Sequence, residues 1–334
     1  YLADVYIKKR SAEPSFINYS IYIGFFPQIM AGPISNSNEI LDSLPQLGHA
    51  TSITKANSFS LIISGLFKKI VIADRISVYT DQIFATPNNY PSIALILSSI
   101  LYSIQIYCDF SGYSDISIGV SGFMGIKCSP NFDLPYFSYS IQDFWRRWHI
   151  SLSSWFRDYV YIPLGGNRCK LPRVIFNLFA VWALTGLWHG ANFNFIAWGI
   201  YYFVIIVLEK YVYGKYLEKL PSLLKHIYAL FLILLGWTIF YFEDFGQFAT
   251  YLTSMFTLKN GIIGGDTLST ILMYLPILIV TAMASLPIWK NTYLKLKDKK
   301  YMGVLEIAFC AVVIVLCTAS LVNQSYNPFL YFRF

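Results

Sequence analysis

The stretch VIFNLFAVWALTGLWHGANFNFIAWGIYYFVIIVLE, residues 174–209, decides the class of fold. It holds two apolar runs, 174–190 and 193–209, which only two residues separate. A helix needs about 20 mainly apolar residues, with a range of about 17 to 25, to cross the hydrocarbon core of a bilayer. We therefore expect two consecutive membrane-spanning helices that run in opposite directions.

Further apolar segments lie on both sides of this pair. Four are uninterrupted: 93–110, 226–245, 268–289 and 303–322. Proline and glycine interrupt segment 16–34, charged residues interrupt 59–80, and segment 112–126 is short and rich in glycine. Such broken segments are tolerated at membrane depth only where protein or a water-filled cavity surrounds them. The pattern thus predicts an internal cavity.

The composition of all 334 residues supports a membrane protein. Hydrophobic residues make up 56% of the chain and charged residues only 13%, about half the charged share of a soluble domain. The five cysteines form no CxxC pair, so we expect neither a disulfide framework nor a metal site. No internal repeat or flexible linker interrupts the chain. We expect an all-α polytopic membrane protein with a single domain, 1–334.

The distribution of basic residues predicts the orientation. Lysine and arginine gather in the connections 146–173, 210–225 and 290–300, whereas 86–92 and 243–267 together hold one lysine. Because basic loops stay in the cytoplasm, the run 174–190 should lead outward and 193–209 should return. The net charge of +7 then reflects topology, and we expect no nucleic-acid partner.

Segment 143–160, DFWRRWHISLSSWFRDYV, has the pattern of an amphipathic helix. At about 100° per residue, Arg146 and Arg157 share one side and an aromatic face lies elsewhere. This predicts a helix in the membrane interface with its rings in the acyl boundary. His149 falls at the margin of the aromatic face. It is either an interfacial residue or a polar group that faces a cavity beside cations able to hold an anionic donor.

His189 closes the span 174–190. An ionisable residue inside a membrane segment is costly there, which makes it a candidate functional residue. Thr185 shares its helix face, and Gly186 and Gly190 would leave room for a substrate. The alternative is a histidine that bonds between helices or lies at the outer interface.

Other polar residues have structural explanations. We expect His49 and His226 to be structural. Asp109 and Asp115 should pair with a lysine or arginine or cap a helix, although they could also face the cavity. The glycine pair 165–166 predicts a turn after the amphipathic segment, with backbone binding of a phosphate as the alternative.

Five strings in the chain resemble those of one protein family, the membrane-bound O-acyltransferases. They are FFPQIMAGPI (25–34), YCDFSGYSDISIG (107–119), FWRRWHISLSSWFRDYVYIPLGG (144–166), LTGLWHGANFNFIAWG (184–199) and NPFLYFRF (327–334). The bacterial branch with alginate and peptidoglycan O-acetyltransferases and teichoic-acid D-alanyl transferases is most similar. The first six residues resemble a string that, in members of the family, follows several N-terminal membrane spans. The resemblance therefore implies that those spans are absent from this chain.

The resemblance implies a ring of helices, some broken or re-entrant, around a central tunnel. An acyl thioester such as acetyl-CoA would enter from the cytoplasm, and an acceptor hydroxyl would enter from outside. His189, in the WHG string, would be the general base. His149 would stabilise the oxyanion or orient the thioester, and Arg146 and Arg157 would bind the donor. No bound cofactor is implied.

The resemblance also implies partners and location. The protein would acylate a cell-surface or periplasmic polysaccharide from the bacterial inner membrane, among membrane lipids, directly or through a partner such as an outer-face SGNH-type acyltransferase. The spacing Phe329-x-Tyr331-x-x-Phe334 resembles the tyrosine motif of the small partner peptide of D-alanyl transferases. Tyr331 would then carry the acyl group. The alternative is an aromatic anchor at the membrane interface.

Other functions remain open on sequence alone. A transporter or flippase could use the two histidines as a proton relay, but the inverted repeat typical of such proteins is not found in the sequence. A membrane scaffold without chemistry and an acyl-histidine mechanism also remain open.

Overall fold

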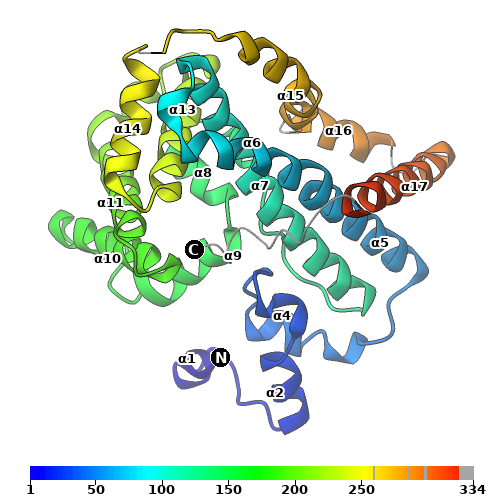
Figure 1. Ribbon diagram of the computed structural model, residues 1–334. Coiled ribbons are helices and arrows are strands. Elements are labelled where there is room, and N and C mark those ends of the chain that lie inside the picture. Colours follow the sequence, from blue (N-terminus) through cyan, green and yellow to red (C-terminus); the bar gives the residue numbers. More distant parts are fainter. Residues whose placement is uncertain (259, 285, 297–298, 323–334) are drawn as a thin grey trace.

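The computed structural model describes residues 1–258, 260–284, 286–296 and 299–322, and every regular element in this part is helical (Figure 1). Five of its helices are long and apolar enough to cross a membrane. Four lie in α7 (Ser92–Phe123), α10 (Leu171–His189), α13 (Ser222–Tyr241) and α17 (Lys300–Val322), and one, Phe193–Leu217, begins with α11 (Phe193–Leu208) and continues through the two short helical segments after it. The expectation of a polytopic helical membrane protein is confirmed.

The remaining elements are shorter. The run expected at 268–289 corresponds to α15 (Gly265–Ala284), whose apolar stretch, 268–283, is shorter than the five spans. The other α-helices are α1 (Leu2–Tyr6), α2 (Phe16–Ile23), α3 (Phe26–Ile29), α4 (Ser37–Leu41), α5 (Ser52–Leu66), α6 (Asp74–Ala85), α8 (Ile141–Arg147), α9 (Ile150–Phe156), α12 (Gly214–Leu217), α14 (Phe245–Phe256) and α16 (Pro287–Leu296). Short π-helical or 3₁₀ segments are η1 (Leu44–Gln46), η2 (Phe67–Ala73), η3 (Pro87–Asn89), η4 (Pro135–Phe137), η5 (Arg157–Tyr161) and η6 (Glu209–Tyr213).

The prediction of a break between 93–110 and 112–126 is wrong, because α7 is continuous over 32 residues. Its glycines serve close packing against α5 instead. A Cβ atom on Gly112 would lie 2.7 Å from the Gly65 carbonyl oxygen, and one on Gly119 would lie 2.7 Å from that of Ser58. Only a residue without a side chain permits two helix backbones to approach this closely. The broken segment 16–34, in contrast, is confirmed as two short helices, α2 and α3.

Two of the charges that interrupt segment 59–80, Lys68 and Lys69, pair with acids, mainly of α7. Lys68 forms an ion pair with Asp115 at 2.6 Å. Lys69 bridges Asp109 at 2.6 Å and Asp74 at 2.9 Å. The expectation that Asp109 and Asp115 pair with lysines is confirmed. The pairs fix α7 against η2, the π-helical segment between α5 and α6.

Hydrogen bonds group the connections as the basic residues predict. The Ser92 amide donates to the Gly261 carbonyl at 3.2 Å, which joins the two connections poor in lysine. Lys210 Nζ donates to Asn167 Oδ1 at 2.6 Å, which joins two basic connections. The connections therefore segregate by charge at these two contacts. An aromatic core that includes Phe144, Trp198 and Trp237 fills the space between α7, α8, α11 and α13.

Candidate active site

The amphipathic segment 143–160 is not one helix. It divides at Trp148 and His149 into α8, α9 and the π-helical η5. His149 adopts the left-handed conformation, with φ 45° and ψ 55°. The neighbouring chain secures the break, because the Asp133 amide donates to the Arg147 carbonyl and the Ile150 amide donates to the Asn131 carbonyl, both at 2.9 Å.

The aromatic face of this segment packs mainly against protein rather than lipid, so the expectation of rings in the acyl boundary is also wrong. Phe144 is fully buried and Trp148 is 3% exposed. The Trp148 ring contacts Phe132 at 5.0 Å and Trp237 at 4.7 Å between centroids. Trp155 alone among these tryptophans stays exposed. The break turns α8 into the aromatic core, which an uninterrupted interfacial helix could not reach.

His149 lies inside the protein, which excludes the interfacial alternative. Its side chain is buried, and its ring meets Phe110 edge-on with centroids 4.7 Å apart. Its Nδ1 lies 3.1 Å from Asn131 Oδ1. The left-handed backbone and this contact direct the imidazole into a cavity instead of toward the membrane.

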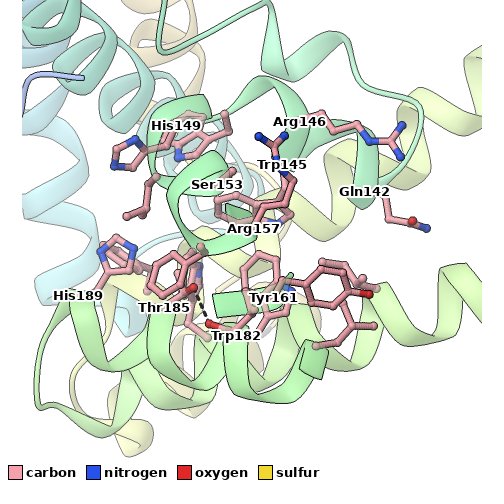
Figure 2. Close-up of a pocket in the computed structure, with 18 of the residues that line it drawn as sticks. Gln142, Trp145, Arg146, His149, Ser153, Arg157, Tyr161, Trp182, Thr185 and His189 are labelled. Carbon is pink, nitrogen blue, oxygen red and sulfur yellow. Dashed lines mark hydrogen bonds between the residues drawn. The ribbon is translucent and has the colours of Figure 1, made fainter. Parts of the chain in front are cut away.

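The structure brings four of the five candidate residues to one cavity of about 300 Å³. His149, His189, Arg146 and Arg157 all line it. Figure 2 shows the two imidazoles on one side and Arg146 with Gln142 on the other. The cavity follows one face of α10 from Leu178 to His189, about 16 Å at 1.5 Å per residue. The fifth candidate, Tyr331, and the tail 327–334 lie outside the described residues.

Aromatic rings surround His189 at the C-terminal end of α10. Its ring lies 5.0 Å from that of Trp198 and 5.2 Å from that of Phe240. Thr185 shares this face as expected; its hydroxyl donates to the Val181 carbonyl at 2.8 Å, the dashed line in Figure 2. These surroundings hold the imidazole in a mainly apolar environment that faces the cavity.

The glycines beside His189 do not leave room for substrate, contrary to expectation. A Cβ atom on Gly186 would lie 2.6 Å from the Phe195 carbonyl oxygen, and one on Gly190 would lie 2.7 Å from the Phe195 ring. Both glycines therefore permit α10 and α11 to pack closely. Gly190 also has φ 156° and ends the helix directly after His189.

One part of the cavity wall is cationic. Arg146 and Arg157 are exposed, and Lys210, which the sequence analysis did not single out, lines the same cavity. Arg157 donates to the Asp158 carboxylate at 2.7 and 3.1 Å, and these bonds raise the pKa of its guanidinium. Exposed cations beside an apolar cavity suit a ligand with an anionic head and an uncharged reactive end.

The other candidates lie outside this cavity. His226 stacks between the rings of Phe137 and Tyr139, each 4.5 Å away, and its Nδ1 contacts the Ser138 carbonyl. His49 is exposed and does not line the cavity. Both amides of the glycine pair 165–166 donate to carbonyls of their own turn, so a turn fits better than a phosphate nest.

Comparison with known proteins adds a family to this geometry. The model of the membrane-bound O-acyltransferase family matches residues 7–218. A "probable alginate O-acetylase" of Pseudomonas putida is 33% identical over all of this chain and 72% of its own length. A "probable alginate O-acetylase" of Pseudomonas aeruginosa is 39% identical over 73% of this chain and 46% of its own length. A peptidoglycan O-acetyltransferase of Helicobacter pylori is 38% identical, over 67% and 44% respectively.

Proposed function

The chain belongs to the membrane-bound O-acyltransferase family and is a multi-pass membrane O-acyltransferase, and from this premise we propose the following reaction. The protein moves an acyl group, most simply acetyl, from a cytoplasmic thioester to a hydroxyl of a polysaccharide. The observation that carries the proposal is the single cavity that both His149 and His189 line, beside Arg146 and Arg157.

His189 acts as the general base. A neutral imidazole removes the proton of the acceptor hydroxyl as the oxygen attacks the thioester carbonyl. The resulting oxyanion collapses, the carbon–sulfur bond breaks, and the proton on His189 passes to the departing thiolate. Proton transfer by a positioned side chain contributes about 10²–10⁴-fold to such a reaction. Rings of Trp198 and Phe240 limit the motion of His189, which supports this role.

His149 and the cations act on the donor. His149 either donates to the oxyanion or orients the thioester. Arg146 and Arg157 bind the phosphates of a donor such as acetyl-CoA, and Lys210 adds a third positive charge. The location of these cations among the basic connections supports entry of the donor from the cytoplasm.

The names of the relatives support the proposed class of acceptor, whereas the partner and the location rest on the family resemblance. These names concern alginate and peptidoglycan, so we propose a polysaccharide outside the bacterial inner membrane as acceptor. Transfer proceeds directly or through an outer-face partner of the SGNH type. Tyr331 remains a proposed acyl relay on the grounds of its spacing. The proposal treats residues 1–334 as one domain.

The test uses membranes that contain the protein and acetyl-CoA labelled in its acetyl group. We expect release of free thiol together with label in polysaccharide as an alkali-labile ester. A protein that moves polysaccharide across the membrane without consuming thioester would instead be a transporter or flippase. The absence of any thioester turnover under conditions in which polysaccharide is acetylated in cells would contradict the proposal.

A further inference from the structure

The Asn131 side chain makes four hydrogen-bond contacts beside the cavity, and the reaction proposed above does not use it. It is 1% exposed and lies in the loop between α7 and η4, where its neighbour Phe132 packs on Trp148. Its Oδ1 receives three contacts: the Ser151 amide at 3.2 Å, the Ser151 hydroxyl at 2.9 Å and His149 Nδ1 at 3.1 Å.

The orientation of the Asn131 amide follows from these contacts. An oxygen and a nitrogen of an amide are distinguished by their hydrogen-bond partners, and the backbone N–H of Ser151 can only donate. The atom that faces Ser151 must therefore be the oxygen. The amide nitrogen then faces Ser114 Oγ at 3.2 Å, which can accept from it.

This orientation determines the tautomer of His149. Because Asn131 Oδ1 can only accept, the proton of this hydrogen bond must be on His149 Nδ1. The Ser151 hydroxyl lies farther from Nδ1, at 3.5 Å, and already donates to Oδ1 while it accepts from the Ile34 amide at 3.0 Å. In a neutral imidazole, a proton on Nδ1 leaves Nε2 with a lone pair.

We infer that Asn131 is a positioning residue that holds His149 in the Nδ1–H tautomer, so that Nε2 offers a lone pair to the cavity. The same residue also holds the left-handed turn, since its carbonyl accepts from the Ile150 amide. His149 is thus a hydrogen-bond acceptor in the resting protein. This deepens the proposed function, on which its catalytic meaning rests. His149 accepts a hydrogen bond from an N–H or O–H group of the bound substrate and thereby orients the substrate. The groups that donate hydrogen bonds to the oxyanion must therefore be other than His149.

The tautomer can be measured without any activity. ¹⁵N spectra of the purified protein, with labelled histidine, separate a protonated from an unprotonated ring nitrogen, and the signals absent from the His149→Asn variant identify those of His149. We expect a protonated Nδ1 and an unprotonated Nε2. A protonated Nε2 in the unmodified protein would overturn the inference, whether or not the protein transfers acyl groups.

Three variants test the role of Asn131. Asn131→Leu replaces the hydrogen-bond acceptor with an apolar side chain of similar size. We expect loss of the Nδ1–H pattern of His149 and a fall in turnover of roughly 10- to 100-fold, the range seen when residues that orient metal-bound histidines are lost. Asn131→Asp keeps an acceptor and should keep the tautomer and more activity. Ser114→Ala, the matched control, removes only the contact to the amide nitrogen and should change neither.

The outcomes discriminate between positioning and structural support. An unchanged His149 spectrum in Asn131→Leu would contradict the inference. If Asn131→Leu does not fold, Asn131→Asp provides the test. A folded Asn131→Asp protein retains a hydrogen-bond acceptor at this position, so loss of the Nδ1–H tautomer of His149 in it would also contradict the inference. A normal tautomer in a protein without any transferase activity would instead contradict the proposed function alone.

Discussion

His149 is the residue at which backbone strain and chemistry coincide. A left-handed conformation costs roughly 1–2 kcal/mol for a residue other than glycine, and hydrogen bonds on both sides of His149 maintain it. Asparagine tolerates this conformation better than most residues, so His149→Asn removes the imidazole while it preserves the turn. The strained position is therefore also one at which function can be tested without loss of fold.

We predict that His149→Asn lowers acyl transfer at saturating donor by about 10²-fold, the cost that misplacement of the reacting groups by about 1 Å can have. Transfer of labelled acetyl in membranes measures this effect. The control is His226→Gln, which changes a partly buried histidine outside the cavity and should retain activity. Turnover in His149→Asn within a few-fold of the unmodified protein would remove His149 from the mechanism.

The exposed cations should contribute to donor affinity rather than to turnover. Removal of Arg146, Arg157 or Lys210, each changed to alanine, should raise the apparent KM for the thioester up to about fivefold, because an exposed ionic contact contributes about 1 kcal/mol at most. The effect should weaken at high salt. Lys219→Ala, which removes an exposed lysine that does not line the cavity, is the control. A normal KM in all three variants would contradict a donor site there.

Residue chemistry was partly predictable from sequence. His189 stands out because ionisable groups are rare in apolar segments, whereas the periodicity of 143–160 and the family resemblance indicate His149, Arg146 and Arg157; the structure brings these four to one cavity. Asn131 could not be found in this way, since its contact with His149 exists only when the chain breaks between α8 and α9. Lys210 is one of several basic residues in the connection 210–225, so the sequence pattern there indicates only topology.

At the scale of helices, the errors share a physical cause. Glycine within an apolar run suggests a break when only local propensity is considered, yet Gly112 and Gly119 lie inside a continuous α7 because α5 approaches them. Conversely, the aromatic periodicity of 143–160 predicts one helix, but burial of Trp148 and the bonds from Asn131 and Asp133 divide it. In both cases a tertiary contact overrides local sequence preference.

The glycine contact gives a prediction at this scale. Gly112→Ala places a Cβ atom 2.7 Å from the Gly65 carbonyl oxygen, and overpacking of this kind costs typically about 1–3 kcal/mol. We expect a lower midpoint of thermal unfolding in detergent.

Gly303→Ala is the matched control for this prediction, because nothing lies within 4 Å of the added Cβ. Alanine should be neutral there or stabilise α17 slightly. Equal midpoints for Gly112→Ala and Gly303→Ala would show that α5 and α7 are not in this close contact.

For the whole molecule, length and hydropathy predicted five of the six uninterrupted apolar runs as helices able to span a membrane, and the sixth, 268–289, corresponds to a shorter apolar helix. The structure adds that contacts join basic connections to each other and connections poor in lysine to each other. The broken segments predicted a cavity, but none of 16–34, 59–80 and 112–126 lines the one described above, whose walls come mainly from α8, α9, α10 and α11. No local pattern contains that information.

We predict that a cysteine in place of Asn260 reacts with an impermeant maleimide added to intact cells, and that one in place of Lys219 reacts only after permeabilisation. Both positions are exposed, and they lie in connections of opposite character. The five native cysteines are replaced first. The opposite labelling pattern would invert the protein and place the cationic wall on the outer side.

The O-acyl content of the surface polysaccharide shows whether the cavity lined by His189 transfers acyl groups. It is compared in cells that produce the unmodified protein, His189→Ala or Leu184→Ala at equal levels in the membrane. Leu184 is exposed on the same helix and does not line the cavity. We predict normal acylation with Leu184→Ala and none with His189→Ala. Normal acylation with His189→Ala would contradict the account.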